Sequence, residues 1–191
     1  MNYQTMVSDL TGMDISNASL LDEPTSAAEA MMLAKRVAKS KSNTFFVNSK
    51  TFKQTIAIIK SRAKPLGVEI EIGDRPDKGK EYFAAYFQYP NAEGSIEDLE
   101  SVTKDIQAKG GLMIIGTDLL ALTLLKTPGD FGADIAVGSA QRFGVPMGFG
   151  GPHAGFMAVK DVYKRSLPGR LIGLTQDLSL IHISEPTRPA L

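Results

Sequence analysis

Short apolar runs alternate with stretches of helical periodicity along most of this chain, and this alternation limits the folds that it can adopt. Residues 43–47 form an apolar strand pattern, and residues 112–115 are the continuous apolar run of a parallel strand covered on both faces. Between them Phe52, Ile56 and Ile59 recur at helical spacing. Strand–helix–strand repetition predicts a three-layer α/β fold, with a mostly parallel sheet and helices on both faces.

Two helix starts are predicted from capping patterns. Ser26 followed by Glu29 is a capping box, and the nearly all-apolar residues 27–34 after it indicate a buried helix. Ser95 followed by Asp98 predicts the start of a second helix. The buried stripe expected on that second helix consists of Ile96, Leu99, Val102 and Ile106.

Composition excludes several classes of function. The 191 residues are 43% hydrophobic, which suffices for one domain with a sizeable core. The 21 basic residues balance the 21 acidic ones, so neither a nucleic-acid partner nor an anionic membrane is expected. With no cysteine and two histidines, no disulfide, thiol nucleophile or metal site is expected. No apolar run reaches the ~20 residues that span a bilayer, and no signal peptide is visible, so a soluble intracellular protein is the default.

A glycine-rich segment at residues 138–155 holds six of the 18 glycines and lies between the apolar runs 134–137 and 156–159. Two interpretations stay open, a tight irregular crossing between strands or the wall of an active site. A phosphate cradle is disfavoured, because no Gly-Lys-Ser/Thr ending is present and a strand pattern, rather than a helix, follows the glycines.

Polar residues gather where the predicted strands end, which is the ligand-binding edge of such sheets. Asp118 follows the strand at 112–115, and Gln141 and Arg142 are expected within reach of the same edge. Arg142 could grip a ligand carboxylate across a subunit interface, or form an internal salt bridge to Asp134 or Asp118. His153 either lines the same cleft or hydrogen-bonds the glycine-rich loop.

Three stretches of the chain carry a family resemblance. The run GSAQRFGVPMGFGGPHAGFMAV at 138–159 closely resembles the N-terminal half of the glycine cleavage system P-protein family. Residues 2–23, NYQTMVSDLTGMDISNASLLDE, with TSAAEAM at 25–31, are similar to the same family, and so is LPGRLIG at 167–173. The resemblance spans about residues 2–177.

This resemblance implies the large domain of a fold-type-I enzyme that depends on pyridoxal 5'-phosphate (PLP), with a mostly parallel seven-stranded sheet. The family decarboxylates glycine and passes the aminomethyl group to the lipoyl arm of the H-protein. Its two halves occur in one chain or in two subunits. The implied partners are therefore the C-terminal half or second subunit, the H-protein and glycine.

In the family, the lysine that binds PLP lies in a His-Lys motif of the C-terminal half. By internal similarity of the halves, that motif falls on Ala140-Gln141 of this chain. Because glutamine has no amine, Gln141 cannot form a Schiff base. The resemblance thus implies that PLP is bound by the other half, and none is expected on this chain.

Enzymes of this fold usually hold the PLP phosphate at a helix N-terminus. The matching helix is expected to start near Ser26, just after Asp22 and Glu23, and Glu29 is expected to occupy one of its free donors. Carboxylates at this position would repel a phosphate dianion. Asp118 falls roughly where the catalytic half has the aspartate that pairs with the pyridine nitrogen, and a plain strand-end cap is the alternative role.

The resemblance ends near residue 177. We therefore expect residues 1–177 to be a partial large domain of the non-catalytic half. Residues 178–191 are interpreted as a non-native tail, because 181–189 looks like a translated cloning adaptor. The implied location is the cytoplasm of a bacterium, which we favour, or the mitochondrial matrix of a eukaryote.

Three hypotheses for function follow. In the first, the chain completes the active site and dimer of glycine decarboxylase and is inactive alone. In the second, it is a structural scaffold that contributes no side chain to the chemistry. In the third, it is a PLP-free module that binds carboxylates at Gln141 and Arg142.

Overall fold

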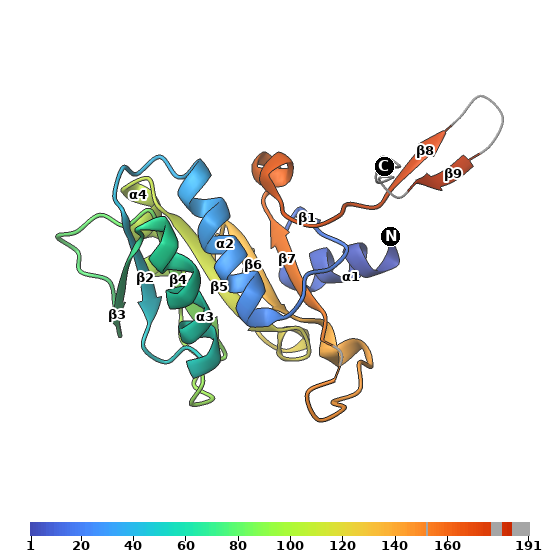
Figure 1. Cartoon of the computed structure of the whole chain (residues 1–191), viewed down its shortest axis with the longest axis horizontal. Coiled ribbons are helices and arrows are strands. Elements are labelled where there is room, and N and C mark those ends of the chain that lie inside the picture. Colours follow the sequence, from blue (N-terminus) through green and yellow to red (C-terminus); the bar gives the residue numbers. More distant parts are fainter. Residues whose placement is uncertain (152, 177–180, 185–191) are drawn as a thin grey trace.

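A seven-stranded sheet forms the centre of the computed structural model, with its strands in the order β1-β7-β6-β5-β4-β2-β3 (Figure 1). The structure describes residues 1–151, 153–176 and 181–184. The strands are β1 Ile15–Ser16, β2 Thr44–Asn48, β3 Glu69–Gly73, β4 Ala84–Tyr89, β5 Leu112–Asp118, β6 Ile135–Ser139, β7 Gly155–Val159, β8 Gly173–Gln176 and β9 Ile181–Ser184. The α-helices are α1 Asn2–Thr11, α2 Glu23–Val37, α3 Lys53–Ala63 and α4 Glu100–Ala108. Short 3-10 helices lie at Lys64–Leu66 (η1), Ala121–Thr123 (η2), Ala140–Phe143 (η3) and Asp161–Ser166 (η4).

The predicted mostly parallel sheet is confirmed. Strands β3, β2, β4, β5 and β6 pair in parallel, whereas β7 runs antiparallel to both β6 and β1. Because parallel strands run in one direction, β4, β5 and β6 reach the same edge of the sheet at Tyr89, Asp118 and Ser139. That edge positions the candidate site.

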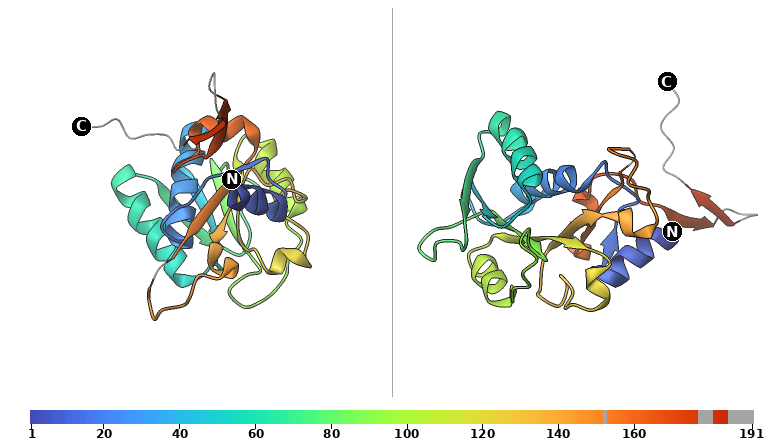
Figure 2. Two further views of the ribbon diagram at one scale, coloured as in Figure 1. Left: turned by 90° about the vertical axis from the view of Figure 1, so that its right-hand side faces the viewer. Right: turned by 90° about the horizontal axis from the view of Figure 1, so that it is seen from below.

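Helices cover both faces of the sheet, which confirms the three-layer prediction (Figure 2). Helices α2 and α3 pack on one face with the inward side chains of β2, β4, β5 and β6, and α1 and α4 cover the other. The small side chains of α2 are buried as expected, including Ala27, Ala30 and Ala34. Gly155 on β7 makes this close packing possible, because a Cβ there would collide with the Ser26 hydroxyl and the Asp22 carbonyl oxygen.

The predicted start of α2 at Ser26 is wrong. The helix begins at Glu23, with Asp22 as its N-cap, and the Asp22 side chain accepts a hydrogen bond of 2.7 Å from the Thr25 amide. Pro24 explains the earlier start, because proline fits the first turn of a helix, where no N–H is needed. Ser26 lies inside the helix, and its hydroxyl donates to the Asp22 carbonyl oxygen at 2.7 Å.

The predicted start of α4 at Ser95 is also wrong. The Ser95 amide donates to the Asn91 side-chain oxygen at 3.0 Å, and the Asn91 amide donates to the Ser95 carbonyl at 3.1 Å, so residues 91–95 form a closed turn. The helix begins only at Glu100. Ile96 therefore lies outside it and is 59% exposed, whereas the rest of the predicted stripe is buried.

The C-terminal region is described only in part. Strands β8 and β9 form a separate antiparallel pair. Residues 181–184 are the one described part of the predicted non-native tail, and the rest of it, with the expected boundary at 177, lies outside the described residues. Within the described ranges, no helix combines the length and apolar character needed to cross a membrane.

Candidate functional site

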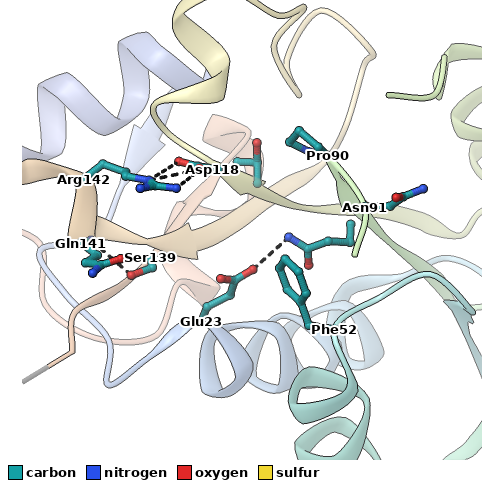
Figure 3. A pocket seen from close by; sticks show the side chains of 10 residues that line it. Glu23, Phe52, Pro90, Asn91, Asp118, Ser139, Gln141 and Arg142 are labelled. Atoms are coloured by element: carbon teal, nitrogen blue, oxygen red, sulfur yellow. Dashed lines mark hydrogen bonds and ion pairs between the residues drawn. The ribbon is translucent and has the colours of Figure 1, made fainter. Parts of the chain in front are cut away.

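A pocket of about 250 Å³ opens at the carboxyl edge of the sheet, beside the N-terminus of α2 (Figure 3). This is the position at which open α/β sheets bind ligands. Three of the predicted site residues, Asp118, Gln141 and Arg142, line it together. The remaining lining residues are Glu23, Phe52, Gln88, Pro90, Asn91, Thr117 and Ser139.

Asp118 and Arg142 form a two-point ion pair within this chain. Arg142 Nε lies 3.0 Å from Asp118 Oδ1, and Nη2 lies 2.7 Å from Oδ2. The internal salt bridge was one of the two interpretations of Arg142, and its side chain stays 49% exposed. Asp118 also accepts from the Leu120 amide at 3.0 Å, the bond expected of a strand-end cap. Partial burial opposes ionisation of Asp118, but Arg142 and the backbone amides of Leu120 and Ala121 outweigh this effect and lower the pKa of the carboxyl.

A chain of hydrogen bonds runs from the core to Glu23. The buried Tyr86 hydroxyl donates to Gln88 Oε1 at 2.8 Å, and Gln88 Nε2 donates to Glu23 Oε1 at 3.0 Å. Burial, together with the charges of Asp118 and Asp22, raises the pKa of Glu23 to about 7, against the lowering effect of the Gln88 hydrogen bond. Glu23 therefore titrates near neutral pH inside the pocket.

The N-terminus of α2 offers almost no free donors to a ligand. Asp22 takes up the Thr25 amide, Pro24 has no N–H, and the Ser26 amide donates to the Asp22 carbonyl oxygen at 2.9 Å. Among the first helical positions only the amide of Glu23 is left. Helix N-termini bind anions through the free backbone N–H groups of the first turn, so this one is poorly suited to a phosphate.

The two other predicted positions differ in placement. Gln141 lies in η3 at the pocket wall, and its amide donates to the Ser139 hydroxyl at 3.2 Å. His153 is exposed and does not line the pocket. Only the first residues of the glycine-rich segment form the wall, since its middle, residues 143–150, is exposed or nearly so and carries Phe149 at a φ of 50°.

No described residues gather into a group of three potential metal ligands.

Sequence reasoning missed Glu23 and Gln88 as members of one site. Gln88 was detectable, because it directly follows the apolar run YFAAYF at 82–87, as Asp118 follows the run at 112–115. The contact between Gln88 and Glu23 joins residues 65 positions apart, and no local pattern predicts it.

Glu23→Gln is expected to stabilise the protein at pH 8 by about 2 kcal/mol and to change it little at pH 4. Because the folded-state pKa of Glu23 lies above the unfolded value, the contribution of its protonated carboxyl to stability is fully present at acidic pH. This contribution is lost as the pH rises toward 7. The amide removes this loss and still offers an oxygen to Gln88. Urea unfolding at both pH values measures the effect, with Glu29→Gln on the same helix as control. Equal pH dependence in wild type and Glu23→Gln would contradict this interpretation.

The family model of the glycine cleavage system P-protein matches residues 1–181. This chain belongs to the glycine cleavage system P-protein family. The glycine dehydrogenase (decarboxylating) of Rhodopseudomonas palustris (strain BisA53) is 56% identical over 178 residues, which cover 92% of this chain and 18% of the relative. That of Rhizobium meliloti (strain 1021) is 55% identical over 93% of this chain and 19% of its own length. The chain thus spans less than a fifth of these curated P-protein relatives.

Superposition on solved structures gives the same family assignment. A crystal structure of glycine decarboxylase (P-protein) in inhibitor-bound form superposes with a TM-score of 0.84 at 36% identity, over 92% of this chain and 41% of that one. An O-acetylhomoserine (thiol)-lyase from Campylobacter jejuni, solved with a pyridoxyl-lysine, has a TM-score of 0.67 at 16% identity, over 87% of this chain and 41% of that one. The second likeness shows the fold alone, that of the fold-type-I PLP enzymes.

Proposed function

We propose that this chain belongs to the half of the P-protein that carries no PLP, and that it completes the active site and the dimer together with the rest of the enzyme. The whole enzyme would decarboxylate glycine and transfer the aminomethyl group to the lipoyl H-protein. PLP, when bound by the other half, supplies the electron sink for that decarboxylation. The catalytic partners of this chain are then the remainder of the P-protein, the H-protein and glycine, and the chain alone is inactive.

The lining of the pocket is the observation that carries this proposal. PLP needs a lysine amine and donors for its phosphate, but position 141 offers a carboxamide and no lining residue is a lysine. The first turn of α2 has its donors taken by Asp22 or removed by Pro24. Glu23 adds a carboxyl group to the lining at this helix turn, which opposes the binding of a phosphate dianion. The residues present do not fit PLP, and this half serves the reaction in another way.

Arg142 is the side chain best placed for such a role. It stands at the mouth of the pocket on η3, oriented by Asp118 and half exposed. A guanidinium held at two points is pre-organised to meet a carboxylate with its remaining N–H groups. The exposed His153 lies on the loop that follows, and we propose that both residues face the catalytic half.

PLP added to the 191-residue chain is expected to change its visible absorbance no more than it does with free lysine, because no lysine lines the described pocket to form a specific Schiff base. The measurement is a spectroscopic titration at a fixed chain concentration, with free lysine at the total lysine content as the reference. A saturable new band with one-to-one stoichiometry would refute the proposal.

A scaffold role is favoured by one observation, since Arg142 is already satisfied by Asp118 within the chain. Kinetics in the full-length enzyme separate the two roles. If Arg142 acts at the active site, Arg142→Ala lowers kcat/KM about ten-fold or more, a loss of about 1.4 kcal/mol of transition-state stabilisation. His153→Ala is the second variant, and the exposed Arg62→Ala on α3 is the matched control. Wild-type rates in all three variants would favour the scaffold.

A further inference from the structure

Among the described residues, no cation pairs with the largely enclosed carboxyl group of Glu23. The charged and titratable groups around it are Asp22 at the cap of α2, Asp118 on β5, Arg142 on η3 and Tyr86 on β4. Asp118 and Arg142 neutralise one another at 2.7 Å. The one hydrogen bond that the Glu23 carboxyl receives from the described residues comes from the neutral amide of Gln88. An enclosed carboxylate without a counter-charge is unfavourable, and a cation that pairs with it recovers that loss.

The walls around Glu23 define what kind of cation fits. The Phe52 ring stands beside Glu23 on one side of the pocket, and Pro90 also lines the pocket (Figure 3). The face of an aromatic ring can contact both a short carbon chain and a cation. Because most of the α2 amides are already used and the Glu23 carboxyl lies beside them, an anion gains little next to Glu23. The volume of about 250 Å³ admits only a small molecule.

We propose that this pocket binds a small organic compound through a primary ammonium group, which pairs with the Glu23 carboxylate and lies against the Phe52 ring. An ammonium group brings three N–H donors, and the second Glu23 oxygen, the Ser139 hydroxyl and the Gln141 carboxamide are acceptors in the lining. The site goes beyond the proposed function. Its failure would leave that proposal standing, because PLP titration tests a different chemistry.

Binding is expected to depend on pH in the wild-type chain. Only ionised Glu23 pairs with the ammonium, and its pKa lies at about 7. Asp118 and Tyr86 keep their charge states between pH 6 and 8, because Arg142 lowers the pKa of Asp118 and burial raises that of Tyr86 well above its usual value. The affinity should therefore rise about five- to ten-fold from pH 6 to pH 8.

The test is an NMR titration of the isotope-labelled chain with ethylammonium chloride, at constant ionic strength set by sodium chloride. We expect saturable shifts of amides around Glu23, Gln88 and Phe52. Sodium acetate should give none, and a glycine arm decides whether a zwitterionic amino acid or only a simple amine is accepted. Glu23→Gln should weaken ethylammonium binding at least ten-fold, whereas Glu29→Gln on the same helix should stay within two-fold of wild type.

Three outcomes would overturn the proposal. The first is ethylammonium binding of equal strength in wild type and Glu23→Gln. The second is the absence of saturable, pH-dependent shifts in the wild-type chain, a measurement that needs no variant to fold. The third is an equal response to acetate and ethylammonium, because it would show a site without charge preference.

Discussion

Asp134→Ala is expected to lower the free energy of unfolding by about 4 kcal/mol, because it leaves buried partners without their acceptor. The Asp134 side chain is 7% exposed, and it accepts from the Met113 amide at 2.9 Å and from Gln107 Nε2 at 2.8 Å. Lys160 Nζ lies 2.8 Å from its other oxygen. One carboxylate thus ties β5, α4 and the end of β7 together. Its partner is Lys160, and Arg142, the alternative that the sequence left open, pairs elsewhere.

Urea unfolding with a matched ion-pair control tests this expectation. Asp161 pairs with Lys164 at 3.0 Å on the surface, where both side chains are about half exposed or more. Asp161→Ala should therefore lower stability by less than about 0.5 kcal/mol. Similar losses in the two variants would show that the bonds to Asp134 do not carry the stability assigned to them.

Gly116→Ala is expected to destabilise the protein by about 3 kcal/mol, through overpacking on β5. A Cβ at this position would collide with the Tyr86 hydroxyl oxygen and lie 2.8 Å from Gln88 Oε1. Tyr86 is buried and cannot move outward, so the hydrogen bonds that lead to Glu23 have to break. The substitution therefore disturbs both the core and the floor of the pocket.

Gly73→Ala is the matched control for this strand glycine. Gly73 lies on the edge strand β3, where a Cβ would find its nearest neighbour at an ordinary 3.5 Å from the Phe46 ring. Alanine there should change the unfolding free energy by less than about 1 kcal/mol. Chemical denaturation of both variants measures the difference, and a tolerated Gly116→Ala would mean that Tyr86 and Gln88 are not held as the structure shows.

Much of the sheet was predictable because strands such as the one at 112–115 are continuous apolar runs, and a chain of this size has to bury such runs on both faces. Burial of α2 followed from its alanines in the same way. Helix starts were less predictable, since Asp22 with Pro24 competes with the capping box at Ser26. The antiparallel direction of β7 leaves no trace in its own residues.

Only the residues that follow strands of the parallel sheet could be assigned to the site from the sequence. Strand ends of a parallel sheet meet at one edge, so Asp118 and Gln141 could be placed together before the structure was known. Glu23 could be placed near a helix N-terminus, but not in contact with Gln88, because that contact depends on how α2 lies across β4. Its shifted pKa is a property of this tertiary arrangement.

Reductive labelling of the full-length P-protein tests the central claim most directly. The enzyme that contains this sequence is loaded with PLP, reduced with borohydride and digested, and the pyridoxyl-lysine is located by mass spectrometry. We expect one labelled peptide, outside the region that corresponds to residues 1–181. Stoichiometric labelling of a lysine within this region, such as Lys126 or Lys160, would contradict the assignment of this half as the one without the cofactor.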